Sequence, residues 1–329
     1  MRPFAYERAE SAEVAVAALA ADPDASFIAG GTSLVDLMST YTEMPGRLVD
    51  VSRIPGLDAI EAREDGLSIG ALARNSDVGA HPAVRELYPA LSEALLAGAS
   101  PQVRNAATMA GNLLQRTRCG YFRNNAATAC NKREPGSGCA AIEGEHRGLA
   151  ILGTSDRCVA NHPSDMAVAL AALDAIVETV GPGGRRSIPV EGLHLLPGDT
   201  PEKETVLERG ELIVAIRVPD SSFAARSHYL KTRDRASFAY ALVSAAVALE
   251  VEDGTIKQAR VALGGVAPKP WRAYASEEAL VGATTTPETF RAAGEAAVLG
   301  ASPLKDNAFK VEFAKRVVAR ALSTVGGAS

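Results

Sequence analysis

Apolar and polar positions in the first 40 residues predict a helix, a strand and a second helix. Ser11 can cap a helix over 12–21, and the apolar run 26–29 predicts a short strand. The strand leads directly into Gly-Gly-Thr-Ser at 30–33, and a second helix is expected over 34–39. Glycines between a strand and a helix start can cradle a phosphate, because their backbone N–H groups can approach an anion. A tight turn that needs glycine only for its backbone is the alternative, and both interpretations stay open.

The next elements follow one another at short spacing. Strands are expected over 47–51, 57–62 and 67–70, followed by a helix over about 83–96. Because these strands are too closely spaced for helical crossovers, the pattern predicts an α+β fold. The nucleotide-binding fingerprints G-x-G-x-x-G and G-x-x-x-x-G-K-[ST] are absent.

Two polar turns lie in the middle of the chain. The first follows Thr108 and contains the small pair Gly111-Asn112. The second, His-Pro-Ser-Asp at 162–165, precedes an apolar helix expected over 166–177, which Ser164 or Asp165 could cap. In the last third of the chain, apolar strands are expected over 241–251 and 260–264, with a turn at Gly254.

The composition is that of an ordinary globular chain. It has 329 residues, 47% of them hydrophobic, and a net charge of −5, so two domains are expected. The charge favours neither nucleic acid nor an anionic membrane as a partner. The first residues lack the apolar core of an export signal, and no run approaches the roughly 18 apolar residues of a membrane span. We therefore expect a cytoplasmic chain that carries no export signal of its own.

The four cysteines change this picture, because all of them fall inside the 40 residues 119–158. They are Cys119, Cys130, Cys139 and Cys158. Such crowding indicates a shared metal centre, although buried thiols and disulfides are alternatives. Zinc is the weaker metal, because gaps of ten, eight and eighteen residues differ from the paired C-x2-C of zinc knuckles. Four thiolates from separate loop segments match the ligands of one [4Fe-4S] cluster.

Basic residues surround these cysteines in the sequence. Cations favour thiolate over thiol and offset the negative charge of a cluster, and a solvated basic surface is the alternative. The basic residues are Arg116, Arg118, Arg123, Lys132, Arg133, Arg147 and Arg157. Glu143, Glu145 and His146 are interpreted as a solvated loop, because the chain shows no H-E-x-x-H spacing and no Ser-His-Asp or Cys-His arrangement. We expect no bond-making on an organic substrate in this chain.

Five ordered segments resemble the FAD-binding medium subunit of the molybdenum hydroxylases, the xanthine dehydrogenase and aldehyde oxidase family. They span nearly the whole chain, which makes them more specific together than singly. The segments are FIAGGTSLVDLM at 27–38, ATMAGNL at 107–113, HPSDMAVAL at 162–170, GELIVAIRVP at 210–219 and YLKTRDRASFAYALVSAAVAL at 229–249.

The resemblance implies a fold of the vanillyl-alcohol-oxidase (PCMH) type. It implies an FAD-binding domain over 1–222, in two parts of about 1–55 and 56–222. A C-terminal domain over 223–329, with a three-stranded antiparallel sheet and helices, would follow. A bacterial branch like the flavin subunit of periplasmic aldehyde oxidoreductases has an added loop holding a [4Fe-4S] cluster. The segment at about 115–160 is similar to that loop, and the four cysteines take the positions of its ligands.

The resemblance also implies the flavin contacts. The glycine segment would cradle the FAD pyrophosphate, Asp165 would hold a ribose or ribityl hydroxyl, Ile213 would pack against the isoalloxazine, and Lys231 would lie near its pyrimidine edge. A helix cap is the alternative role of Asp165. Phe238 would flank the ring or, more simply, serve as a core aromatic. The implied contacts are Ile28, Ala29, Gly30, Gly31, Thr32, Ser33, Leu34, Thr108, Gly111, Asn112, Asp165, Ile213 and Lys231.

The function that the resemblance implies is electron transfer in a heterotrimer. A large partner subunit would hold a molybdenum cofactor that oxidises an aldehyde, and a small partner would hold [2Fe-2S] clusters. Electrons would pass through FAD on this chain to an external acceptor: oxygen, quinone, ferredoxin or NAD. The alternatives are the corresponding subunit of an aryl-CoA reductase, like 4-hydroxybenzoyl-CoA reductase, and a zinc-stabilised module that binds a phosphate ligand. A periplasmic location would require co-export with a partner that bears a signal.

Overall fold

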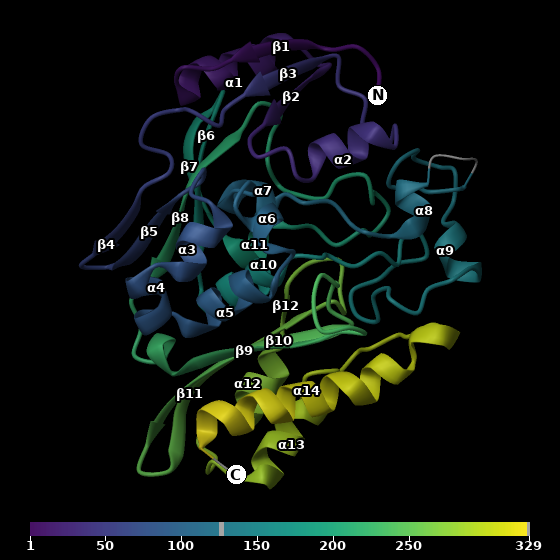
Figure 1. Cartoon of the computed structure of the whole chain (residues 1–329). Coiled ribbons are helices and arrows are strands. Elements are labelled where there is room, and N and C mark those ends of the chain that lie inside the picture. The colour runs from purple at the N-terminus through teal and green to yellow at the C-terminus, as the bar shows by residue number, and fades with distance from the viewer. Residues whose placement is uncertain (125–127, 328–329) are drawn as a thin grey trace.

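The computed structural model describes residues 1–124 and 128–327, which form three sheets with helices between and around them (Figure 1). The first sheet is parallel, in the order β1-β3-β2. Its strands are β1 (Ala5–Arg8), β2 (Ala25–Ile28) and β3 (Arg47–Asp50). Helices α1 (Ala12–Ala21) and α2 (Leu34–Ser39) connect them, as predicted. Ser11 caps α1 by accepting a hydrogen bond from the Val14 amide.

The second sheet is antiparallel and has the order β4-β5-β8-β6-β7. Its strands are β4 (Ile60–Arg63), β5 (Gly66–Gly70), β6 (Ile176–Gly181), β7 (Gly184–Pro189) and β8 (Leu212–Pro219). The strand expected over 57–62 is β4, which begins three residues later. The short helices α7 (Met109–Leu113) and α11 (Val190–Leu193) contact this sheet, and α3 (Asn75–Ala80) contacts α6 (Pro101–Arg104).

Two predicted helices differ from the structure. The helix expected over 83–96 is divided into α4 (Pro82–Leu87) and α5 (Pro89–Ala97), because Pro89 lacks an amide hydrogen and restricts the residue before it. The helix expected over 166–177 is α10 (Asp165–Ala172), which ends before Asp174 at a positive φ of 53°. The β-branched residues that follow pair in β6 instead, so the end of that prediction was wrong.

The third sheet forms the C-terminal part and is antiparallel, in the order β12-β11-β10-β9. It contains three long strands, as expected, and one short fourth strand: β9 (Ser227–Thr232), β10 (Val243–Glu252), β11 (Thr255–Gly264) and β12 (Trp271–Arg272). The predicted turn at Gly254 joins β10 to β11, with φ of 76°. Helices cover one face of this sheet: α12 (Tyr274–Leu280), α13 (Pro287–Ala296) and α14 (Phe309–Gly326). The α+β prediction is therefore confirmed.

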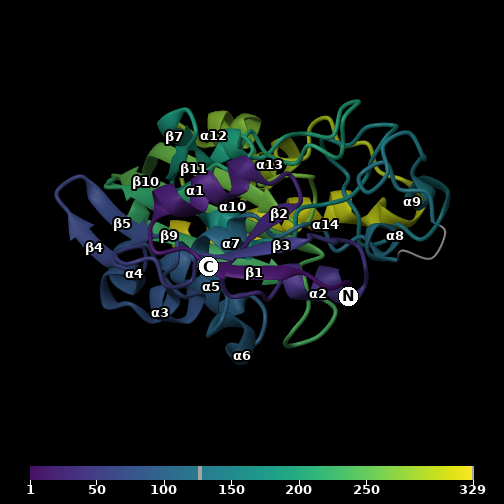
Figure 2. The same cartoon turned by 90° about the horizontal axis from the view of Figure 1, so that it is seen from above.

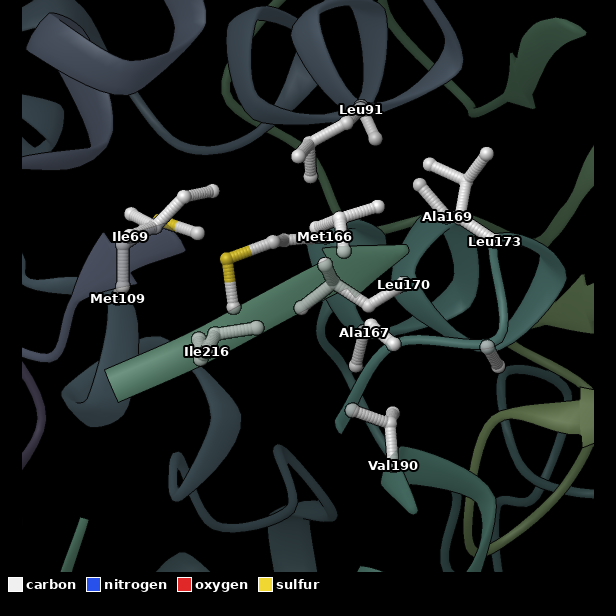
Figure 3. Packing of buried hydrophobic residues seen from close by; sticks show 14 of the residues in the cluster. Ile69, Leu91, Met109, Met166, Ala167, Ala169, Leu170, Leu173, Val190 and Ile216 are labelled. Atoms are coloured by element: carbon white, nitrogen blue, oxygen red, sulfur yellow. The ribbon is translucent and has the colours of Figure 1, made fainter. Parts of the chain in front are cut away.

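Helix α10 lies at the centre of the largest core. All eight of its residues are buried, and it packs between α5, the second sheet and the third sheet. Figure 3 shows Met166 and Leu170 of this helix between Leu91 on one side and Ile216 of β8 on the other. A helix that is apolar on every face is stable only when it is surrounded in this way. The first residue of α10 is thereby held at a defined place between the sheets.

The cysteine segment lies at one end of the molecule, away from the sheets (Figure 2). It contains two single-turn helices, α8 (Gly120–Arg123) and α9 (Ala140–Glu143). Lys310, at the start of α14, donates from Nζ to the carbonyls of Gly148 (3.2 Å), Leu149 (2.8 Å) and Gly265 (2.6 Å). The C-terminal helix therefore fastens the end of the cysteine segment to the third sheet. Among the described residues, no helix is both long and apolar enough to cross a membrane.

The buried ammonium group of Lys310 predicts a pH dependence of stability. Burial lowers the pKa of Lys310 from 10.5 to about 7, with a smaller contribution from Arg147. Between these pH values the unfolded chain binds more protons than the folded chain, so the free energy of unfolding rises with pH. Lys310→Met should remove this slope, which is at most about 1.4 kcal/mol per pH unit. Urea denaturation from pH 7 to 10 measures it, with exposed Lys305→Met as the control. Equal slopes in Lys310→Met and wild type would contradict the prediction.

Candidate functional site

Two adjoining pockets meet at Thr32, Ser33 and Gly111. The larger has a volume of about 360 Å³ and lies between the glycine segment, α7 and the start of β8. Its walls are mainly apolar and include Phe27 and Leu72. The smaller has a volume of about 80 Å³, and its walls combine polar and apolar side chains in similar proportion. Together they form a groove with one apolar end and one more polar end, suited to an elongated ligand with a phosphate centre.

The glycine segment is pressed against a second piece of backbone. A Cβ atom at Gly30 would lie 1.9 Å from the carbonyl oxygen of Ala106, so a side chain cannot be accommodated. Gly31 has φ of +71°, which favours glycine. This close approach brings the turn after Thr108 beside residues 30–33. The predicted strand, glycine pair and helix start thus form one wall of the groove.

Most of the predicted flavin contacts line this groove. Ten of them border the larger pocket: Ile28, Ala29, Gly30, Gly31, Thr32, Ser33, Leu34, Thr108, Gly111 and Ile213. Asn112 and Asp165 border the smaller one. Thr108 also caps α7, accepting from the Gly111 amide at 3.3 Å, and Asn112 accepts from the Ser164 hydroxyl at 2.8 Å. Segments far apart in the sequence therefore converge as the motifs predict.

Asp165 is the most constrained of these residues. Its Oδ1 accepts from the Tyr229 hydroxyl at 2.5 Å, and its Oδ2 pairs with Lys231 Nζ at 2.8 Å. Burial, and then the charge of Asp165, raise the pKa of Tyr229 well above its ordinary value, so Tyr229 stays a donor. Ser164 caps α10 by accepting from the Ala167 amide at 3.0 Å. The alternative that Asp165 serves as the cap is therefore not what the structure shows.

Lys231 and Phe238 differ from the simplest expectations. Lys231 is almost fully buried, pairs with Asp165, donates to the Ala97 carbonyl at 3.2 Å and lines neither pocket. Lys231 therefore holds the Asp165 carboxylate in place without lining the groove itself. The structure does not bring Lys231 into one pocket with Ile213. Phe238 is 56% exposed at a positive φ of 49°, so the simpler interpretation as a core aromatic was wrong.

Three further residues of the smaller pocket escaped the sequence analysis as ligand contacts. Asn75 Oδ1 and Arg118 Nε are buried and have no hydrogen-bond partner in the structure, and Tyr240 is half exposed. Unpartnered buried polar atoms that border a pocket indicate that a ligand completes their bonding. The position of Arg118 next to Cys119 in the sequence could have marked it as a candidate ligand contact. No motif in the sequence around Asn75 marks it as a ligand contact.

The four cysteines also converge. Cys119, Cys130, Cys139 and Cys158 all line one hollow, and the backbones of Cys130 and Cys139 pair as an antiparallel bridge. All four are free thiols, and three are buried. Burial raises the pKa of Cys119, and it raises that of Cys158 to about 11, although Lys132 opposes the rise at Cys158. Within residues 1–124 and 128–327, no three acidic, histidine or cysteine side chains are placed for a single metal ion.

The basic residues near the cysteines are mostly paired, so they do not form a freely solvated basic surface. Arg118 and Arg123 bind Asp36 of α2, each at 2.8 Å. Arg147 pairs with Asp234, Arg133 donates to backbone carbonyls of the segment, and Arg157 Nε lies 3.9 Å from Asp156 Oδ1. His146 is buried and accepts from the Asp306 amide at 3.0 Å, so its assignment to a solvated loop was wrong. These pairs fasten the segment to α2 and to the C-terminal domain.

The fold and groove define a class: a three-sheet α+β protein whose glycine segment and polar pocket suit a dinucleotide. Residues 2–221 match the family described as the FAD binding domain in molybdopterin dehydrogenase, and residues 227–325 match the CO dehydrogenase flavoprotein C-terminal domain. The chain therefore belongs to the FAD-binding oxidoreductase subunits of the molybdenum hydroxylase family. The resemblance found from the five segments is confirmed.

Similar proteins cover nearly the same length. The aldehyde oxidoreductase FAD-binding subunit PaoB of Escherichia coli (strain K12) is 50% identical over 326 residues, 98% of each chain. The carbon monoxide dehydrogenase medium chain of Hydrogenophaga pseudoflava is 29% identical over 97% of this chain and 96% of its own. A solved structure of carbon monoxide dehydrogenase from that organism matches with a TM-score of 0.78 at 30% identity, covering 99% of this chain and 98% of the other. Quinoline 2-oxidoreductase from Pseudomonas putida 86 matches with a TM-score of 0.77 at 25% identity, covering 99% and 98%.

The tight packing at Gly30 predicts a loss of FAD on substitution. Gly30→Ala must push the Ala106 backbone away, which distorts the wall of the groove and should cost about 1–3 kcal/mol. Gly183→Ala is the control, because a Cβ there meets nothing within 4 Å. We expect Gly30→Ala to purify with much less flavin absorbance per chain and a lower Tm, and Gly183→Ala to match wild type. Full FAD content and an unchanged Tm in Gly30→Ala would contradict the assignment.

Proposed function

We propose that this chain is the electron-transfer flavin and iron-sulfur subunit of a heterotrimeric, molybdenum-dependent aldehyde oxidoreductase. Its partners would be a large subunit with the molybdenum cofactor and a small subunit with [2Fe-2S] clusters. The relative named as an aldehyde oxidoreductase subunit, at 50% identity over 98% of both chains, supports the aldehyde as the substrate class. The observation that carries the iron-sulfur part is the convergence of four free thiols on one hollow.

The arrangement of the thiols favours a [4Fe-4S] cluster over zinc. A structural zinc ion needs four ligands close enough to surround one atom tetrahedrally. The described side chains form no such group, whereas the four thiols border a common hollow from four separate positions in the segment. A cube of iron and sulfide is wider than a single ion, so it can bind thiolates that surround a hollow from separate positions in the chain. The four cysteines are therefore proposed as its ligands.

The residues around each site perform the tasks that a redox subunit needs. In the groove, the glycine backbone would hold the pyrophosphate, and Asp165, kept in place by Tyr229 and Lys231, would accept from a ribose or ribityl hydroxyl. At the cysteines, the apolar side chains of Phe122 and Ala141 are buried and line the hollow. FAD, when bound, supplies one-electron and two-electron transfer, and the protein tunes it by nearby charges.

The proposed electron flow is from the aldehyde at the partner's molybdenum site, through the partner's [2Fe-2S] clusters, to FAD and then to an external acceptor. We propose that cofactors are loaded in the cytoplasm, because thiol ligands must stay reduced until the metal is bound. A signal on a partner subunit would decide whether the assembled complex is then exported to the periplasm.

The cysteine assignment predicts a specific loss of iron. Cys130→Ser, in chain expressed with its partners and purified without oxygen, should lose iron, acid-labile sulfide and the brown cluster absorbance. FAD content should stay near wild type, because the groove is built from other residues. Ala129→Ser is the matched control, since it changes the neighbouring residue of the same hollow and keeps all four thiols.

Two outcomes would overturn the assignment. Cys130→Ser could retain all of its iron, which would show that its thiol is not a ligand. Wild-type chain could instead contain stoichiometric zinc and no brown colour, which would support the zinc-stabilised alternative. Comparing aldehydes with aryl-CoA thioesters as substrates of the purified complex tests the substrate class in the same preparation.

A further inference from the structure

A row of four charged side chains runs from the cysteine hollow to the flavin groove. Lys132 Nζ lies 2.9 Å from Glu204 Oε1. Glu204 Oε2 pairs with Arg116 Nε, and Arg116 Nη1 pairs with Glu43 Oε1. We call Lys132, Glu204, Arg116 and Glu43 the charge bridge. Its members come from the cysteine segment, the loop before β8 and the loop after α2, so only the folded chain brings them together.

Each end of the charge bridge borders one of the two cofactor sites. Lys132 lines the hollow that contains all four cysteines. Arg116 and Glu43 line the larger pocket of the groove, together with the glycine segment. The Arg116 guanidinium also lies 4.5 Å from the centre of the Phe122 ring, and Phe122 lines the cysteine hollow. Arg116 therefore contacts a wall of each site.

The charges of the bridge are balanced and shielded from water. The Lys132 side chain is 8% exposed, and those of Glu204, Arg116 and Glu43 are 24–30% exposed. Burial alone would raise the pKa of Glu204, but the charges of Arg116 and Lys132 lower it below its ordinary value. Glu204 is therefore ionised at neutral pH, and two positive and two negative groups cancel. Partly buried charges act on their neighbours more strongly than exposed ones, because the effective dielectric constant is smaller.

We propose that the charge bridge is a positioning and tuning element that couples the reduction potentials of the two cofactor sites. This inference rests on the proposed function, since it requires FAD in the groove and a cluster on the cysteines. Glu204 is its central member, because it alone binds a cation on each side. Neutralising Glu204 leaves one excess positive charge on the bridge, which favours added electrons at both sites. Neutralising Lys132 leaves an excess of negative charge, which disfavours them.

The test compares charge changes of opposite sign. Glu204→Gln and Lys132→Gln are made in the full chain within its purified complex, and midpoint potentials of the cluster and FAD are measured by titration followed by EPR and visible absorbance. Glu204→Gln should shift both potentials upward, and Lys132→Gln should shift both downward. Each shift should correspond to a change on the order of tenfold per electron in the equilibrium constant of reduction. This is the effect of a unit charge roughly 10 Å away at an effective dielectric constant of about 20. Glu202→Gln, in the same loop but outside both sites, is the control.

The outcomes separate this coupling from the proposed function. Iron and FAD contents are measured first, and wild-type complex without cluster iron would overturn the proposed cluster and the coupling with it. Loaded variants whose potentials stay at the wild-type values would overturn only the coupling. Shifts of the same sign in Glu204→Gln and Lys132→Gln would also overturn it, because they would show a structural disturbance in place of a charge effect.

Discussion

The buried contact of Asp165 with Lys231 and Tyr229 determines how the two halves of this chain fit together. Asp165 begins the central helix α10, whereas Lys231 and Tyr229 belong to β9 of the C-terminal sheet. A buried carboxylate without its cation would cost several kcal/mol, so the helix and the sheet must meet in this register. The polar end of the flavin groove forms at the same place. One interaction therefore joins the domains and shapes the cofactor site.

The cysteine segment depends on a different kind of contact. Its described residues form two single-turn helices and a small apolar cluster, so little burial stabilises it alone. Arg118 and Arg123 attach it to α2, and Lys310 attaches its end to the C-terminal domain. Because α2 directly follows the glycine segment, the same ion pairs place the cysteine hollow next to the flavin groove. The cysteine segment is thus held by elements that also build the flavin groove.

Local pattern predicted several elements, among them α1, α2, β10 and β11, and its errors have local causes. Helices α1 and α2 followed from capping and apolar spacing, whereas Pro89 divided one predicted helix and Asp174 shortened another. The glycine segment and the cysteines were found as candidate sites because each is concentrated in a short stretch of sequence. Asn75, whose unpartnered oxygen borders the groove, could not be found in this way. Its role depends on packing against residues far along the chain.

By itself, the sequence determined the family, the α+β class, the glycine cradle and the four cysteines, because these depend on residue types in short, ordered segments. Only the tertiary structure decided how the charges pair. It turned Lys231 toward Asp165 instead of the groove, and it joined Arg116 to Glu204 and Glu43 across 88 and 73 residues of chain. Such pairs follow from the relative placement of whole elements, which the packing of the apolar cores and the buried contact of Asp165 set together. No local pattern contains that information.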